Sequence, residues 1–208
     1  MRKTAVLSAL ALTTAALSSP AFAAPKLAKA KVLLVKDTAG DANFLTSQLG
    51  VGAVDNVATP TSLKDSDILS FSLARLDNGT KVKAVVATLN LAAAPTSGRD
   101  YRIKMASPSC STYFLEFEWL PGGALAPAGE IRDNCAPLPA GSTANFTPVD
   151  AVIKGSSIVW TIPVSAFTGD VKLGTVLTVK GAESSVETVA IAPQIDRVTV
   201  NTTYKIGQ

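Results

Sequence analysis

One stretch of the chain concentrates side-chain oxygen atoms around a tight turn. Residues 37–43 read DTAGDAN, so two carboxylates lie four residues apart and an asparagine follows them. Gly40, between the two acids, permits the positive φ that such a turn needs. A hard divalent cation takes roughly six to eight oxygen ligands, mostly carboxylates and carbonyls. The residue types and their spacing therefore predict a calcium site formed by Asp37, Asp41 and Asn43.

A second acidic pair precedes the next apolar segment of the chain. Asp67 lies where that segment begins, and we expect it to add a carboxylate to the loop from a neighbouring strand, with Asp65 as the alternative. The loop is not an EF-hand, because the glutamate that ends such a loop is missing. The other interpretation is an ordinary turn in which Asp and Asn side chains bond to their own backbone. A metal here would be structural, and it would make the stability of the fold depend on calcium.

The chain contains no histidine and only two cysteines. It therefore lacks the residues for Ser-His-Asp or Cys-His catalysis and for zinc sites built from histidine or several thiolates. Carboxylate chemistry, a Ser/Lys arrangement and an oxygen-ligated cation stay open. Glu116 and Glu118 lie two residues apart on one predicted strand face, where alternation predicts exposure to solvent. Catalytic acid pairs normally face each other across a cleft, so we predict no enzyme, with a carboxylate-dependent hydrolase as the alternative.

The first 23 residues have the pattern of a bacterial export signal. Arg2 and Lys3 precede an apolar run over 5–17, and Ala21 and Ala23 supply the small side chains that a signal peptidase recognises. We predict cleavage after Ala23 and a secreted, extracellular protein. The alternative is a membrane anchor, but the apolar run is shorter than the roughly 20 residues of a spanning helix.

Both cysteines lie in the part of the chain that would be exported. In an oxidising compartment, two cysteines most simply form one disulfide. We therefore predict a bond between Cys110 and Cys135, with a stabilisation of about 3.5 kcal/mol from loop closure. The alternative is a nucleophilic cysteine, which usually needs a base such as histidine nearby.

The charges of the chain are nearly balanced. The whole sequence has 19 Lys+Arg and 16 Asp+Glu, and removing the leader removes two of the basic residues. Nucleic acids and anionic membranes need a concentrated basic face, so neither is an expected partner. The local basic cluster of Lys26, Lys29 and Lys31 is interpreted as a solvated linker. We predict a linker over 24–30 and a single, monomeric domain over 31–208.

From residue 31 onward, apolar residues recur with a period of two, which is typical of half-buried strands. Gly, Pro, Asn and Asp separate about nine such segments, and this pattern predicts an all-β, antiparallel β-sandwich, with a closed barrel as the alternative. The proline-rich stretch 121–141 is expected to be an excursion tied back by the disulfide. The predicted strands are 31–36, 66–76, 80–91, 101–105, 113–119, 149–153, 157–164, 175–181 and 197–206, with 130–133 as an optional short strand.

Two parts of the sequence resemble calcium-binding jelly-roll sandwiches. The loop 37–43 follows a short apolar strand, and Asp-Ser-Asp-Ile at 65–68 leads into the strand 69–73. This order is similar to the opening of DOMON-like modules, of family-nine-like carbohydrate-binding modules, and of the sandwich domains appended to secreted bacterial glycosidases and subtilisin-like proteases. The segments 159–167 (VWTIPVSAF) and 174–177 (GTVL) are similar to a late strand and turn of the same modules. The resemblance implies a jelly-roll-like sandwich, a structural calcium ion and a binding function.

These observations together predict a secreted, non-catalytic binding or accessory module. Its ligand would be a glycan, an extracellular protein or the cell surface. The large aromatic residues fit inward strand positions, which favours the core over a sugar-binding platform; they are Tyr113, Phe117, Trp119 and Trp160. The main alternative is a structural component of the cell surface that binds no small ligand.

Overall fold

The computed structural model describes residues 27–42, 63–123, 126–135, 137, 145–186 and 194–208 of the 208-residue chain. The predicted signal peptide, its cleavage site at Ala23 and the predicted ligand Asn43 lie outside these residues. Within them, no helix is long and apolar enough to cross a membrane.

The described chain is almost entirely β-structure, as the period of two predicts. Two short 3₁₀ turns, η3 (Pro121–Gly123) and η4 (Val164–Ala166), are the helical elements that lie wholly within the described residues. Ten strands account for the rest of the regular structure. They are β1 (Val32–Lys36), β2 (Ile68–Asp77), β3 (Val82–Leu91), β4 (Arg99–Ala106), β5 (Tyr113–Trp119), β6 (Ala128–Asp133), β7 (Phe146–Lys154), β8 (Ser157–Pro163), β9 (Val176–Val186) and β10 (Gln194–Lys205).

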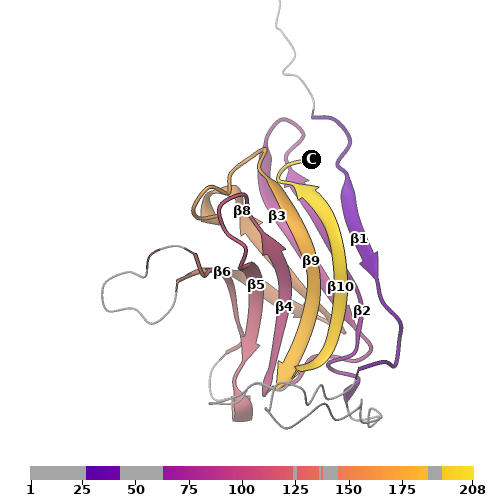
Figure 1. Cartoon of the computed structure of the whole chain (residues 1–208). Helices are drawn as coiled ribbons and strands as arrows, with labels where there is room; N and C mark the ends of the chain where they lie inside the picture. The colour runs from indigo at the N-terminus through magenta and orange to yellow at the C-terminus, as the bar shows by residue number, and fades with distance from the viewer. Residues whose placement is uncertain (1–26, 43–62, 124–125, 136, 138–144, 187–193) are drawn as a thin grey trace, which may run out of the picture.

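The strands form one antiparallel sheet that folds over on itself into a two-layered sandwich. Its order is β1-β2-β3-β8-β7-β6-β5-β4-β9-β10. The ladder between β6 and β7 joins the two layers along one side. On the other side the sheet curls until β10 comes back to contact β2, close to β1, so the sheet is nearly closed (Figure 1). The antiparallel sandwich predicted from the sequence is confirmed, with ten strands.

The core lies between the two layers and consists of the inward residues of the alternating strands. Trp160 of β8 meets Phe117 of β5 edge-to-face, with ring centroids 6.2 Å apart. The Trp160 indole also donates a hydrogen bond to the Glu116 carbonyl oxygen at 3.0 Å. Tyr113 is likewise buried, and Trp119 packs against the core from its rim. These aromatic side chains serve as core residues, as alternation along the strands predicted.

One disulfide joins Cys110, which follows β4, to Cys135, which follows β6. The two Cα atoms are 5.4 Å apart, and the residues are separated by 25 positions in the sequence. The bond closes a loop that contains β5 and β6, and it fixes the start of the excursion after β6 to the sheet. The predicted pairing is therefore confirmed.

Candidate metal centre and charged sheet face

Three carboxylates meet at the end of the sandwich where β1 finishes and β10 begins. Asp37, Asp41 and Asp196 each offer one oxygen, and these oxygens all lie within 4.8 Å of one another. Asp37 is held there because its N–H donates to the Leu69 carbonyl oxygen at 2.9 Å, which continues the β1–β2 ladder. Asp196 is held because its Oδ2 accepts a 2.7 Å hydrogen bond from the Ile68 N–H. Through these hydrogen bonds the group joins three segments that are far apart in sequence: the loop after β1, the start of β2 and the start of β10.

Asp67 lies directly beside this group. Its Oδ2 accepts a 2.8 Å hydrogen bond from the Gly40 N–H, and the residue is only 4% exposed. Its other oxygen, Oδ1, is buried without a hydrogen-bond partner, and the same holds for Oδ2 of Asp37. Leaving buried polar atoms without partners is costly, so such atoms in a native fold usually indicate an unseen water or ion. Two orphaned carboxylate oxygens beside two further carboxylates form a donor set suited to a hard cation.

The pKa values of the group reflect the crowding of negative charge. Burial raises the pKa of Asp196 to about 6, and the nearby Asp41 and Asp37 raise it further, against the amides of Ile68 and Arg197. Burial also raises the pKa of Asp37; the charges of Asp41 and Asp67 add to this effect, and a backbone hydrogen bond at Thr38 opposes it. A divalent cation would reverse this by favouring the ionised form of every carboxylate it contacts.

The predicted ligands are thus brought together in part. Asp37 and Asp41 lie in the group, and Asp67 lies beside it through its hydrogen bond with Gly40; their role as metal ligands stays a prediction. Asp65, the alternative to Asp67, instead forms an ion pair with Arg99 at 3.2 Å and accepts a hydrogen bond from the Thr96 hydroxyl at 2.5 Å. That carboxylate is therefore engaged elsewhere.

Asp196 was not predicted as a member of the group. It lies 128 residues after Ile68, the residue that positions it, and no local spacing relates the two. The sequence signal for Asp196 was an acidic residue next to the apolar Ile195 in the last strand. In the structure both residues are buried, and the register of β9 and β10 is irregular at this point. Only the pairing of β10 with β9, and the curl that returns β10 to β2, places this carboxylate.

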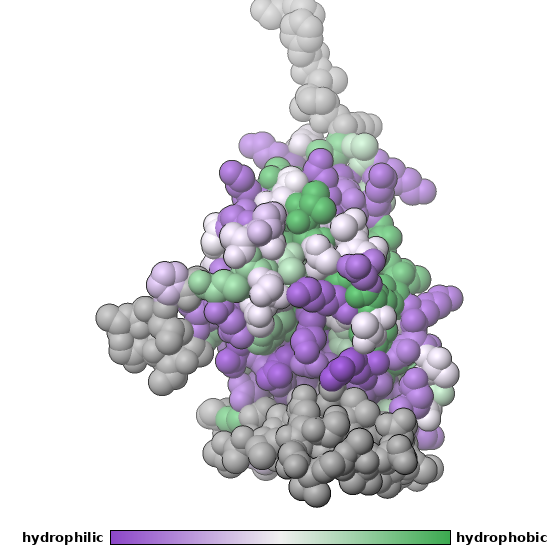
Figure 2. All heavy atoms as spheres, viewed as in Figure 1, coloured by the Kyte–Doolittle hydropathy of each residue, from purple (hydrophilic) through white to green (hydrophobic). Residues whose placement is uncertain are grey.

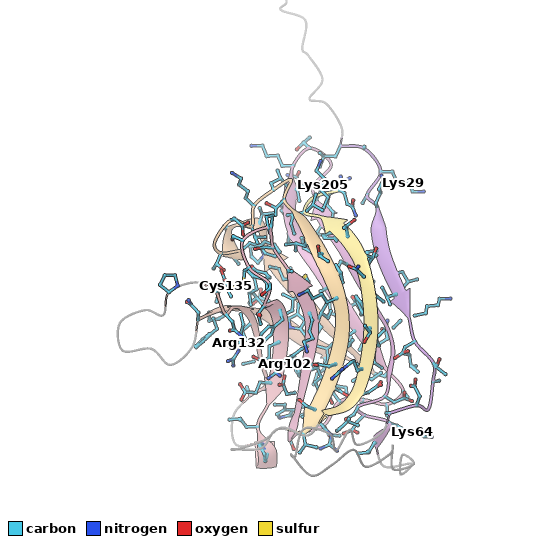
Figure 3. The ribbon with its side chains drawn as sticks, in the orientation of Figure 1. Lys29, Lys64, Arg102, Arg132, Cys135 and Lys205 are labelled. Carbon is cyan, nitrogen blue, oxygen red and sulfur yellow. A yellow bond between two sulfur atoms is a disulfide. The ribbon has the colours of Figure 1, made fainter. Side chains whose placement is uncertain are left out.

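A second cluster of charges lies on the outer face of the layer formed by β6, β5, β4, β9 and β10. Glu183, Arg102, Glu116 and Glu130 occupy paired positions on β9, β4, β5 and β6, forming a row across four strands. Arg102 contacts Glu116 at 2.5 Å, and Arg132 forms ion pairs with both Glu116 and Glu130. Figure 3 shows Arg102 and Arg132 on this layer.

The expectation that Glu116 faces solvent was wrong. Glu116 does point to the outer face of its strand, but it is only 1% exposed because the side chains around it cover the carboxylate. Burial acts to raise the pKa of Glu116, but the hydrogen bond with Glu130 and the charges of Arg102 and Arg132 lower it overall. Burial and the same hydrogen bond raise the pKa of Glu130 to about 7. Below about pH 7, Glu130 therefore keeps its proton and can donate it in a hydrogen bond to Glu116.

Comparison with protein-family models, with curated proteins and with solved structures finds no match to this chain. The interpretation of the site therefore depends on the geometry of its own residues. That geometry offers two groups of residues that can do chemistry. The carboxylate group of Asp37, Asp41, Asp67 and Asp196 can bind a cation, and the hydrogen-bonded pair of Glu116 and Glu130 can hold and transfer a proton.

Proposed function

We propose that this protein is a secreted, non-catalytic binding or accessory module whose sandwich is stabilised by Ca²⁺. The observation that carries the metal is the meeting of three carboxylate oxygens within 4.8 Å, beside a buried carboxylate oxygen that has no partner. Asp37, Asp41, Asp67 and Asp196 would hold the ion. The ion would supply the positive charge that lets these carboxylates stay ionised side by side.

The role we assign to the ion is mechanical. Its ligands come from the end of β1, from the loop after it, from the turn before β2 and from the start of β10. These are the segments at which the two free edges of the sheet approach each other. A cation would therefore link the edges and hold the first strand on the sandwich. Because it binds only the folded arrangement, its binding free energy would add to the stability of the fold.

Export and location are part of the proposal. Residues 1–23 would act as a bacterial signal peptide cleaved after Ala23, and the mature protein would work outside the cell. The disulfide between Cys110 and Cys135 supports this, because such bonds persist in oxidising compartments and are rare in the cytosol. We expect a monomer whose partner is a glycan or an extracellular protein.

Two other functions are distinguishable from this one. A structural component of the cell surface would bind no soluble glycan but would sediment with cells or peptidoglycan. A carboxylate-dependent hydrolase would use Glu116 and Glu130, since Glu130 keeps a proton near neutral pH and could act as a general acid. Turnover of glycoside, ester or peptide substrates that is lost in Glu130→Gln would favour the hydrolase.

The metal is tested by calorimetric melting in CaCl₂ and in EGTA. At calcium concentrations about 100-fold above Kd, linkage predicts a gain of about 2.7 kcal/mol for the wild-type protein. For a domain of this size the gain corresponds to a rise in Tm of about 5–10 °C. Asp41→Ala should lose the rise, whereas Asp150→Ala, an exposed acid on β7, should keep it. Wild-type melts that coincide in calcium and chelator would rule out the metal site.

A further inference from the structure

A cavity of about 490 Å³ lies at the end of the sandwich opposite the carboxylate group. The segment before β1 forms one wall, and the turn before β9 and the end of β10 form the other. Strand β10 connects the two ends: Asp196 is near its start and Lys205 at its finish, which corresponds to roughly 30 Å of extended chain. The cavity volume is within the range of sites for small molecules, roughly 300–1,000 Å³.

Arg75 of β2 holds the walls of this cavity in place. Its side chain is 5% exposed, and Nε is ion-paired with Asp77 at 2.8 Å. One terminal nitrogen donates to the Gly207 carbonyl oxygen at 3.2 Å, and the other donates to the carbonyl oxygen of Ala28. A single buried guanidinium thus joins the N-terminal segment and the end of the chain to β2. The cavity is therefore formed by specific contacts.

Three lysines line the same cavity: Lys29, Lys31 and Lys205. Among the described residues, none of the three forms an ion pair, in contrast to the arginines of the charged sheet face. Figure 3 shows Lys29 and Lys205 at the same end of the molecule, with Lys64 at the other. The charge of Arg75 is balanced by Asp77, so it is the three lysines lining one hollow that give this end of the molecule a positive potential, which favours an anion.

The cavity also presents an apolar surface. Leu173 is 55% exposed on one wall, and Leu27 and Val82 lie among the other lining residues. Figure 2 shows hydrophobic side chains among hydrophilic ones in the upper part of the molecule. A bare inorganic anion would leave this surface in water, whereas an anion with a short alkyl arm would cover it. Burying such an arm contributes about 0.8 kcal/mol per CH₂ group.

We propose that this cavity, which we call the lysine cup, binds phosphate esters. Lys29, Lys31 and Lys205 would contact the phosphate oxygens, and the alkyl part of the ester would lie against Leu173. A phosphate monoester suits the cup better than a carboxylate, because it carries a charge of about −1.5 to −2 and three acceptor oxygens. The same chemistry occurs in a soluble phosphate ester and in the headgroup of an anionic phospholipid.

Calorimetric titration with inorganic phosphate and with butyl phosphate tests the cup, and co-sedimentation with phosphatidylglycerol vesicles tests the lipid source. We expect butyl phosphate to bind more tightly than inorganic phosphate. The double substitution Lys29→Gln, Lys205→Gln should weaken butyl phosphate binding by about tenfold or more, since each lost ammonium removes a charge-assisted contact. Leu173→Ser should remove the advantage of butyl phosphate and leave the affinity for inorganic phosphate unchanged.

Lys64→Gln provides the matched control, because it removes an exposed lysine at the opposite end of the sandwich. Binding of butyl phosphate that is weakened only by the cup substitutions supports a soluble ester as ligand. Cup-dependent binding to vesicles alone supports a lipid headgroup. A loss of affinity in Lys64→Gln equal to that of the cup variants would show non-specific charge attraction and overturn the proposal, as would the absence of saturable binding to every probe. Thermal melts of each variant verify that it folds.

Discussion

The backbone N–H of Gly40 donates a hydrogen bond to Oδ2 of Asp67 at 2.8 Å, across 27 residues of sequence. This contact fixes the turn of the acidic loop against the start of β2 without any metal. It leaves Oδ1 of Asp67 buried and without a partner beside the carboxylates of Asp37, Asp41 and Asp196. The loop is therefore already positioned, and what a cation would add is the neutralisation of crowded charge.

Asp196→Asn should change stability in opposite directions with and without calcium. The folded protein raises the pKa of Asp196 to about 6, so at pH 8 this carboxyl is ionised at a cost that the unfolded chain does not carry. In EGTA at pH 8, the amide should raise the free energy of unfolding by about 3 kcal/mol, because the pKa is raised by about two units and each unit corresponds to about 1.4 kcal/mol. In saturating calcium, the same variant should be less stable than wild type, because a ligand is lost.

Urea denaturation in calcium and in EGTA measures both effects. The amide oxygen of the variant can still accept the hydrogen bond from Ile68, so the backbone contact of β2 is retained. Asp150→Asn, on the exposed face of β7, is the control and should shift neither curve. If Asp196→Asn is destabilising to the same extent in both buffers, the carboxyl has only a structural role and the metal site loses a ligand.

Glu130→Gln should stabilise the protein at alkaline pH and have little effect in acid. The folded protein raises the pKa of Glu130 to about 7, so it keeps this proton at pH values where the unfolded chain has lost it. Glu130 therefore contributes to the free energy of unfolding below about pH 4.5, and this contribution is lost as the pH rises to about 7. Glutamine can donate the same hydrogen bond to Glu116 at every pH. At pH 8 we expect the variant to be more stable than wild type by about 3 kcal/mol, because the pKa of Glu130 is raised by about two and a half units.

Denaturant midpoints of wild type and Glu130→Gln, measured between pH 4.5 and pH 8, test this. Glu118→Gln is a suitable control, because Glu118 lies on the same face of β5 but is more exposed than Glu116. The difference between wild type and Glu130→Gln should grow from about pH 4.5 to about pH 7 and then level off. A difference that is independent of pH would mean that Glu130 and Glu116 do not share a proton.

The secondary structure could be predicted from the sequence because most strands here are half-buried and alternate. The segment 113–119 is an example: its predicted bounds are those of β5. The strand β9 was predicted to stop at residue 181, but it continues to Val186. Alternation fails after Gly181 because the residues from Ala182 to Ser185 are all buried, including the charged Glu183. Burial there is set by neighbouring strands and by the charged row, which local sequence does not specify.

The candidate site was predictable from spacing only where it is local, at Asp37 and Asp41, which lie four residues apart around one turn. Asp67 was expected there because it begins the next apolar segment, although it lies 27 residues from Gly40. Asp196 and the partnership between Glu116 and Glu130 depend on which strands become neighbours. The pairing of β6 with β5 brings Glu130 opposite Glu116. Strand order is a property of the whole sheet, and no spacing in a single segment encodes it.

Removal of the disulfide should destabilise the protein by about 3.5 kcal/mol. In the chain-entropy model, the bond between Cys110 and Cys135 stabilises the fold by restricting the unfolded chain over a loop of this length. The double variant Cys110→Ser, Cys135→Ser should therefore melt about 7–14 °C lower. The comparison is a thermal melt with and without reductant: wild type should lose stability in reductant, and the double variant should not respond. Equal melting of wild type in both conditions would contradict the prediction.

Gly181→Ala should disrupt the ladder between β9 and β10. Gly181 has a φ of 140°, and an added Cβ would lie 1.8 Å from the carbonyl oxygen of Val198 and 2.9 Å from its carbonyl carbon. These are backbone atoms of the partner strand, so relief requires β10 to move. Its movement would also displace Asp196, which the same strand carries. We expect a loss of about 3 kcal/mol or more, at the upper end of single substitutions, and a weaker calcium response.

Gly155→Asn in the turn between β7 and β8 is the matched control. Gly155 also has a positive φ, of 61°, but an added Cβ there meets no atom within 4 Å. Asparagine tolerates this left-handed conformation better than most residues, so the control should lose no more than about 1 kcal/mol. Urea midpoints and calcium-dependent melts of both variants separate the effects. If Gly181→Ala lost stability but kept the full calcium-induced rise in Tm, the metal would not depend on the placement of β10, and Asp196 could not be one of its ligands.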